Sequence, residues 1–444
     1  MRSPRTRFIV VCAVIFVIGV GVGVAAALLP KYLRGEPGLT FVARVAQLLP
    51  GTYEVKKEDE ISSATDLQPL TTFWEVREQI KRNFVHGIDA EEEKQLTYGA
   101  VRGMLKALDD PYTRFMTPED YKEFNVENAG QFDGIGAELT MRKDDKTGVD
   151  KVIITAPIPG GPAEKAGILA GDVIIKVDDK PIQDLTLPEV VKRIRGQRGT
   201  EVKLTVIRED QPKPIDKAIV RDKIEIPSLE SKILEGKIGY IWLRRFDRLT
   251  EPRLHEAIAQ LQQQGMKGLL LDLSINPGGL LDSAVRVGGM FVSGPVVWIE
   301  ERGAEPHPMN AEPGQQIDPK LPIVVLINEA SASASEIVAG AIQDDKRGLV
   351  VGQKSFGKGK VQTVIELNDG SALAITTANY LTPLKRNIDE KGITPDRVLE
   401  KPKEGDEKLT MTAYHEQQLA QAIDVMKKDL AQRAGAEASQ PAGG

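Results

Sequence analysis

Residues 322–344 of the 444-residue chain read PIVVLINEASASASEIVAGAIQD. An apolar run opens this stretch, the alternating serines Ser331, Ser333 and Ser335 follow, and a run with helical periodicity closes it. This order predicts a buried strand that leads directly into a helix, with the serines at the junction. There a hydroxyl can be exposed at the edge of a sheet, and the unpaired N–H groups and positive dipole end of the helix can receive an oxyanion.

A purely structural role also accounts for these serines. Ser333 and Glu336 have the spacing of a capping box, and serine before a helix commonly caps it. The segment alone therefore leaves a nucleophile and a helix cap as alternatives.

A nucleophilic serine needs a base, and no histidine of this chain lies in a segment that resembles a site. Lysine can act as the base where burial lowers its pKa, because desolvation disfavours the ammonium form. The glycine-flanked Lys358 in residues 355–362 (SFGKGKVQ) is the candidate, and its alternative is a surface lysine in a turn. A phosphate-binding loop is excluded, because the glycine spacing and the following Ser or Thr of the Walker motif are missing.

Residues 268–280 (GLLLDLSINPGGL) predict a buried strand, a turn at Asn276-Pro277-Gly278-Gly279 and a helix. Such a turn can present a main-chain N–H group to an oxyanion, and taken alone it is simply a tight connection.

The surrounding segments alternate between strands and helices and indicate an α/β core in which helices cover a sheet. The predicted strands are 237–243, 268–273, 296–300, 322–327, 349–352, 361–367 and 373–379, and the predicted helices are 250–264, 280–291 and 335–344.

Upstream of a polar, proline-bearing linker at 209–215, the chain has short β-type runs separated by Gly and Pro. The predicted elements of this part are strands 151–156, 172–178 and 201–207 and a helix at 187–195. Helical periodicity occurs at both ends of the chain, in 71–84, 92–108 and 405–433.

Residues 8–30 (FIVVCAVIFVIGVGVGVAAALLP) carry no charge over 23 positions, long enough to cross about 30 Å of hydrocarbon as a helix. We expect an uncleaved transmembrane anchor, and the small residues near its end leave a cleaved signal peptide as the alternative. Three arginines precede the segment and two cationic residues follow it, which favours a cytoplasmic N-terminus. The expected location is therefore the cytoplasmic (inner) membrane, single-pass, with the remaining chain on the periplasmic or extracytoplasmic side; the alternative is secretion after cleavage.

The composition excludes several classes of function. With 58 Lys and Arg against 64 Asp and Glu, a net charge of −6 and a pI near 5.6, the chain lacks the basic surface that nucleic-acid binding requires. The single cysteine, Cys12, excludes an internal disulfide and a cysteine-rich metal site. His255 and His415 each precede a Glu, but neither has a second His four residues on, so the helical zinc-protease motif is absent. We expect no metal site and no cofactor.

Together, the motifs NPGG, SASASEI and FGKGKVQ, in this order after a β-rich module, resemble the carboxyl-terminal processing proteases, also called tail-specific proteases. The resemblance covers roughly residues 70–400 and includes 107–124 (ALDDPYTRFMTPEDYKEF), 131–138 (QFDGIGAE), 161–178 (GPAEKAGILAGDVIIKVD) and 380–397 (YLTPLKRNIDEKGITPDR). It implies a serine peptidase with a Ser/Lys dyad and an embedded PDZ domain.

Carried over to this sequence, the resemblance implies Ser333 as nucleophile and Lys358 as general base. Gln362 would hold the lysine amine by a hydrogen bond without adding a charge that raises its pKa. Ser331 and Ser335 would cap and pack the junction.

The resemblance further implies that the N–H groups of Ala334 and Gly278 receive the oxyanion, with Gly279 as the alternative to Gly278. The chain departs from the family pattern at Ser274, where an arginine is common, and at Glu329-Ala330, where a glycine often precedes the serines. These departures concern the packing around the oxyanion turn and remove no catalytic group.

In the PDZ-like stretch, the N–H groups of Ile135, Gly136 and Ala137 would capture the terminal carboxylate of a peptide that adds as a strand beside the domain. Taken alone, these residues form an ordinary glycine-bearing turn.

The fold class that we predict is an α/β protease core with an embedded β-rich PDZ domain, helical N- and C-terminal regions and one N-terminal transmembrane helix. The predicted divisions are a cytoplasmic N-terminus (1–7), the anchor (8–30), a helical N-terminal region (31–125), the PDZ domain (126–212), the protease core (213–400) and a helical C-terminal region with a disordered tail (401–444).

The predicted function is that of a membrane-anchored serine endopeptidase that recognises protein C-termini through its PDZ domain and cleaves near them. Protein substrates bound by their C-terminal tails are its predicted partners, and residues 36–108 and 405–433 are predicted to form a homodimer. The alternatives are a catalytically silent, membrane-tethered PDZ scaffold and a helical adaptor protein.

Overall fold

The computed structural model describes residues 68–143, 149–211, 213–401 and 411–438. The chain divides into two compact units, residues 1–90 and 91–444, and helix α3 (Gln68–Asn83) belongs to the first. Within the described residues, no helix has the length and apolar character needed to cross a membrane. The predicted anchor, residues 8–30, lies outside the described residues.

The second unit is built on a six-stranded sheet whose strands are β10 (Leu229–Leu234), β11 (Ile238–Leu243), β12 (Gly268–Asp272), β15 (Ile323–Ile327), β16 (Leu349–Gly352) and β19 (Arg397–Val398). They pair in this order; β10 is antiparallel to β11, and the other pairs are parallel. The four long parallel strands lie where the sequence predicts them.

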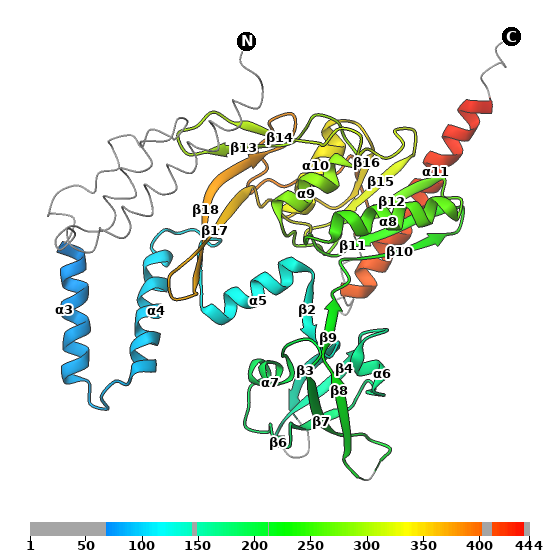
Figure 1. Ribbon diagram of the computed structural model, residues 1–444. Coiled ribbons are helices and arrows are strands. Elements are labelled where there is room, and N and C mark those ends of the chain that lie inside the picture. Colours follow the sequence, from blue (N-terminus) through cyan, green and yellow to red (C-terminus); the bar gives the residue numbers. More distant parts are fainter. Residues whose placement is uncertain (1–67, 144–148, 212, 402–410, 439–444) are drawn as a thin grey trace, which may run out of the picture. The chain divides into compact units, whose positions relative to one another are not determined.

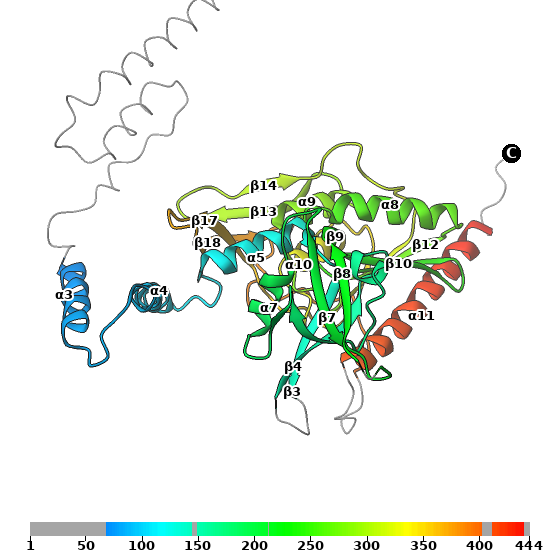
Figure 2. The same ribbon diagram turned by 60° about the horizontal axis from the view of Figure 1, so that its bottom comes forward.

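Helices cover both faces of this sheet (Figure 1). Residues of α8 (Thr250–Gln263), α9 (Leu281–Gly289) and α10 (Ala334–Asp344) share one buried cluster with Leu269 and Leu271. Residues of α11 (Met411–Ala438) form a separate cluster with Leu270. Because alternate residues of β12 are buried on opposite faces, the strand is apolar up to its last residue, the buried Asp272. Figure 2 shows α8 and α11 on opposite sides of the sheet.

A second, antiparallel sheet lies beside the first. Its strands are β1 (Arg114–Met116), β13 (Pro295–Glu301), β14 (His307–Asn310), β17 (Lys360–Glu366) and β18 (Ala372–Leu381), with β18 paired to β1, β13 and β17. Helices α4 (Ala90–Lys106) and α5 (Pro118–Ala129) flank β1 in sequence. Tyr98 of α4 donates a hydrogen bond of 2.9 Å to Asp369, in the turn between β17 and β18.

The β-rich module has a sheet in the order β3 (Ala137–Lys143), β4 (Asp150–Pro157), β5 (Val173–Val177), β7 (Glu201–Ile207) and β8 (Ile215–Val220). The short strand β6 (Lys180–Pro181) pairs with β5, and α6 (Pro162–Lys165) and α7 (Leu187–Ile194) complete the module. Strand β8 pairs with β7 over its whole length, so the sheet extends past residue 212, the predicted end of this module. Strands β2 (Gln131–Gly134) and β9 (Asp222–Glu225) pair with each other and carry the chain into and out of it.

Candidate active site

The three motifs meet at the carboxyl ends of β12 and β15. Ser333 is the N-cap residue of α10 and has a φ of 55° and a ψ of −112°, and a positive φ is uncommon for a residue other than glycine. Its side chain is partly exposed and lines a cavity of about 450 Å³. A sharp turn between strand and helix therefore presents this serine to open space.

The two outer serines have a different role. Ser331 donates from Oγ to the carbonyl of Leu273 at 2.8 Å, and Ser335 donates from Oγ to the carbonyl of Asn276 at 2.9 Å. Both are fully buried. They join the serine turn to the NPGG turn, and Ser333 is the member of the three that faces the cavity.

Lys358 lines the same cavity as Ser333. Burial lowers the pKa of Lys358, and the nearby positive charge of Arg114 lowers it further. Its amine lies 4.7 Å from the ring centroid of Tyr112, on the aromatic face. No direct hydrogen bond between Ser333 Oγ and Lys358 Nζ occurs in the described structure; catalytic hydrogen bonds are often long in the absence of substrate.

A fully buried carboxylate connects the segments that carry Ser333 and Lys358. Glu336 accepts hydrogen bonds through Oε2 from the N–H groups of Ser333 (2.8 Å) and Lys358 (2.9 Å). Through Oε1 it accepts from Ser355 Oγ and the N–H of Gly357, both at 2.6 Å. Glu336 is thus more than a capping residue, because it fixes the lysine loop against the N-terminus of α10.

Tyr380 of β18 provides a second connection. Its hydroxyl lies 3.1 Å from the carbonyl oxygen of Ser333 and is also hydrogen-bonded to the carbonyl oxygen of Lys358. The ring is almost completely buried, and burial raises the pKa of this phenol, which keeps it a hydrogen-bond donor.

The NPGG turn packs directly against the serine. A Cβ atom on Gly278 would lie 2.9 Å from the Cβ of Ser333 and 3.0 Å from the nitrogen of Ala334, so only glycine allows this approach. However, the N–H of Gly278 donates to Asn276 Oδ1 at 2.9 Å and is therefore occupied. Gly279 lines the cavity, as does Ala334, and among the described residues neither N–H has an acceptor.

Gln362 also lines the cavity, but its side-chain amide donates to Thr376 Oγ1 at 3.3 Å. The structure therefore brings Gln362 to the site without the expected hydrogen bond to Lys358.

In the β-rich module, Ile135 and Gly136 lie between β2 and β3, and Ala137 begins β3. The carbonyls of Ile135 and Gly136 accept hydrogen bonds from Ala163 (2.8 Å) and Ile158 (2.9 Å). In the described structure the N–H groups of Ile135 and Gly136 have no acceptor. The loop is thus fixed through its carbonyls, with two donors available for a carboxylate.

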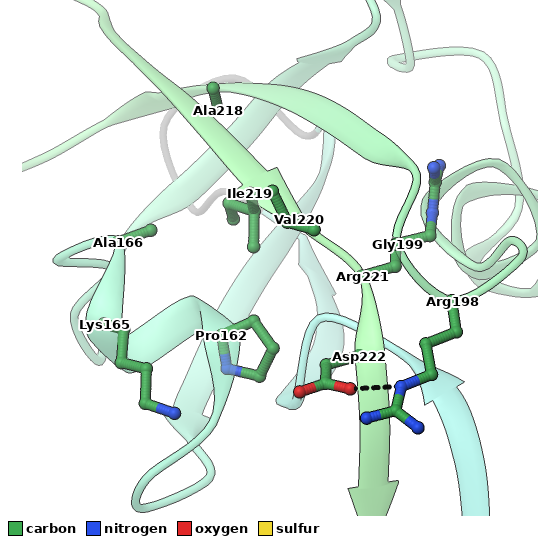
Figure 3. A pocket seen from close by; sticks show the side chains of 10 residues that line it. All are labelled: Pro162, Lys165, Ala166, Arg198, Gly199, Ala218, Ile219, Val220, Arg221 and Asp222. Atoms are coloured by element: carbon green, nitrogen blue, oxygen red, sulfur yellow. Dashed lines mark hydrogen bonds and ion pairs between the residues drawn. The ribbon is translucent and has the colours of Figure 1, made fainter.

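Figure 3 shows another hollow of this module, between α6 and strands β8 and β9. It has a volume of about 490 Å³, and an ion pair of 2.7 Å joins Arg198 to Asp222 at its wall. None of its lining residues is a predicted catalytic or peptide-binding residue.

The sequence did not predict the role of Tyr380 or the clamping role of Glu336, although both residues lie within quoted motifs. No histidine was expected near the site, whereas His415 of α11 contacts Asp272, the last residue of β12, at 2.7 Å. Within the described residues, no group of three or more His, Cys, Asp or Glu side chains could hold a metal ion.

Comparison with protein-family models gives three matches. Residues 237–399 match Peptidase family S41, residues 153–208 match the PDZ domain, and residues 43–120 match the Activating protease CtpB N-terminal domain.

Curated relatives carry related names. The chain is 41% identical over 340 residues to the "Carboxy-terminal-processing protease" of Bartonella bacilliformis, a match that spans 75% of each chain. It is also 41% identical over 315 residues to the "Probable CtpA-like serine protease" of Staphylococcus aureus, spanning 70% of this chain and 62% of that one. Among solved structures, a photosystem II D1 C-terminal processing protease is 33% identical, with 75% of this chain and 93% of that chain covered and a TM-score of 0.42.

Proposed function

The chain belongs to peptidase family S41 and contains a PDZ domain, and on this premise we propose that it cleaves proteins near their C-termini with a Ser333/Lys358 dyad. The observation that carries the proposal is geometric. Ser333 and Lys358 line one cavity, and the buried carboxylate of Glu336 holds the main chain of both.

The lowered pKa of Lys358 favours a neutral amine, which can accept the Ser333 hydroxyl proton as the oxygen attacks the peptide carbonyl. The N–H of Ala334 is one donor to the oxyanion. We place the second donor at Gly279, because the N–H of Gly278 is bonded to Asn276. The ammonium of Lys358 then protonates the leaving amine, and water hydrolyses the ester at Ser333.

Apolar side chains line the cavity beside the nucleophile and favour an apolar residue of the substrate next to the cleaved bond. The apolar residues concerned are Leu280, Leu281, Ile337, Val361 and Val364. We propose that Gln362 moves from Thr376 to the lysine amine when substrate closes the cavity.

The PDZ domain supplies substrate selection in this proposal. The unpaired N–H groups of Ile135 and Gly136 support capture of a free C-terminal carboxylate, with Ala137 at the start of the strand beside which the tail would add.

We further propose that residues 8–30 anchor the chain in the cytoplasmic membrane, with its enzymatic part on the extracytoplasmic side, and that residues 36–108 and 405–433 form a homodimer. The charge-free 23-residue segment supports the anchor. Recovery of the full chain in an alkali-washed membrane fraction tests it, and release into the wash would contradict it. Sedimentation in detergent tests the dimer, and a strict monomer would contradict it.

A fluorophosphonate probe tests the nucleophile directly. We expect mass spectrometry of the labelled full chain to place the adduct on Ser333, and Lys358→Met to slow labelling severely. An adduct on Ser331 or Ser335 would contradict the assignment. Inhibition of cleavage by EDTA that added metal reverses would contradict a metal-free mechanism.

A further inference from the structure

Resting on the proposed function, we propose that His415 is a positioning residue for the peptidase reaction, which acts through Asp272 on the turn that supplies an oxyanion donor. The helix that carries it, α11, packs on the face of the sheet opposite to α10 and contributes no residue to the lining of the catalytic cavity. The connection therefore passes through the sheet, from its far face to the site.

His415 lies near the start of α11 and is only 5% exposed. Its Nε2 is 2.7 Å from Asp272 Oδ2, and its ring stacks on the Trp242 ring with 4.3 Å between centroids and an interplanar angle of 28°. Arg244 covers the same tryptophan at 4.0 Å from the ring centroid. These contacts fix both the position and the orientation of the imidazole. A side chain that only filled space would not need a fixed orientation.

The two carboxylate oxygens of Asp272 have different partners: Oδ2 contacts His415 of α11, and Oδ1 contacts Ser274 at the start of the turn. Oδ2 receives the hydroxyl of Tyr240 at 2.9 Å as well as His415. Burial and the carboxylate raise the pKa of Tyr240, so the phenol remains a donor. Oδ1 receives the N–H of Ser274 at 2.9 Å and its hydroxyl at 2.5 Å. Since the carboxylate is rigid and fully buried, a change at Oδ2 is transmitted to the first residue of the turn.

The turn that follows Ser274 has a strained main chain and depends on contacts that hold it in place. Ile275 has a φ of 58°, a strained conformation for a β-branched residue, and its N–H donates to Asn328 Oδ1 at 3.1 Å. The carbonyl of Asn276 receives Ser335 Oγ and the N–H of Ala332. Strained conformations persist only where surrounding contacts over-determine them, so each holding contact matters.

Loss of His415 leaves Asp272 Oδ2 with only Tyr240 as a partner. A buried carboxylate that loses a partner is strongly destabilised and turns toward water or another donor. The contact of Oδ1 with Ser274 then weakens, and the turn up to Gly279 relaxes. A displacement of about 1 Å at a catalytic group can lower a rate about 100-fold.

A neighbouring residue on α11 reaches the other turn. Tyr414 donates from its hydroxyl to Glu329 Oε2 at 3.1 Å, four residues before the nucleophile, and Lys401 pairs with Glu329 at 2.8 Å. The beginning of α11 therefore contacts the segments that carry both the nucleophile and the oxyanion turn.

The test compares His415→Ala and His415→Gln with Met426→Ala in the full chain. Met426 is fully buried in the same helix and belongs to the apolar cluster against which Trp242 packs, and its thioether has no hydrogen to donate to Asp272. We expect His415→Ala to lower kcat at least tenfold with KM changed less than twofold. Met426→Ala should lower Tm comparably and leave kcat within twofold well below Tm. His415→Gln, whose side-chain N–H can reach Asp272, should recover most of the lost kcat.

Equal losses of kcat in His415→Ala and Met426→Ala, or unchanged kcat in a folded His415→Ala, would overturn the inference. If His415→Ala does not fold, Ser274→Ala is the variant that tests the inference. It removes only the hydroxyl that donates a hydrogen bond to the same carboxylate, that of Asp272. Lower kcat at unchanged KM supports the inference, and unchanged kcat overturns it. An inactive wild type whose Ser333 takes no fluorophosphonate would instead refute the proposed function, so the two failures are distinguishable.

Discussion

Glu336→Gln is the substitution that tests the geometry of the site most sharply. The carboxylate accepts four hydrogen bonds, two at each oxygen, whereas the amide of Gln has one accepting oxygen and one donating group. The amide is best placed with its donating group toward Ser355, whose hydroxyl can turn and accept. The N–H of Gly357 then loses its acceptor. The N–H groups of Ser333 and Lys358 still have an acceptor, but it is the neutral amide oxygen of Gln instead of a charged carboxylate oxygen.

The size of the effect follows from these contacts. One buried N–H without an acceptor costs about 1–3 kcal/mol, and the loss of charge assistance at two remaining bonds costs about 1 kcal/mol each. Removing a buried charge offsets part of this, since burial raises the pKa of Glu336. The net loss of about 2–4 kcal/mol is smaller than the stability of about 5–15 kcal/mol that is usual for a folded protein, so the variant should fold with a lower Tm.

The catalytic effect should exceed the effect on substrate binding. Release of Gly357 lets the lysine loop move relative to Ser333, and a displacement of about 1 Å lowers kcat about 100-fold. We expect KM within threefold of the wild type, because Glu336 does not line the cavity. Steady-state cleavage and thermal unfolding measure both quantities, with the exposed Glu366→Gln as control. A Glu336→Gln variant with the expected loss of Tm and a wild-type kcat would refute the clamp.

Three further predictions concern charge and recognition. Because burial lowers the pKa of Lys358 below its unfolded value, the folded state binds fewer protons between these two pKa values, and stability rises with pH across this window. Lys358→Met should therefore raise Tm at pH 7, with a gain that shrinks above pH 10 in calorimetry; a lower Tm at pH 7 would contradict this. Arg114→Gln removes a charge that lowers the same pKa, so the acid limb of kcat/KM should move to higher pH, and an unmoved limb would count against electrostatic tuning. Peptides with an amidated C-terminus should bind the PDZ domain at least tenfold more weakly than free acids in calorimetric titrations, and equal affinity would argue against carboxylate capture by Ile135 and Gly136.

Strands β11, β12 and β15 could be predicted because each is buried on both faces of the sheet. The run 268–271 of β12 and the whole of β15 are apolar, and turn residues bound them. The edge strands could not be predicted in the same way. Strand β14 (HPMN) has no apolar alternation, and β8 begins inside the polar segment that we interpreted as a linker. Their pairing depends on neighbouring strands, which local sequence does not reveal.

The segments that bring Ser333 and Lys358 to one cavity could be singled out from the sequence because each carries its candidate residue in a short motif. The resemblance implied that Ser331 and Ser335 cap and pack the junction, but their partners, the carbonyls of Leu273 and Asn276, needed the structure. The hydrogen bond from Gly278 to Asn276 also depends on the folded turn. His415 and Asp272 are 143 positions apart, and no local pattern connects them.

The central claim is that Ser333 and Lys358 perform the cleavage. The most direct measurement is mass spectrometry of an unstructured protein with a free, apolar C-terminus after incubation with the purified full chain, Ser333→Ala or Lys358→Ala. We expect fragments from the wild type alone, with all three proteins folded to the same extent by circular dichroism. Cleavage by either variant at a rate comparable to the wild type would contradict it.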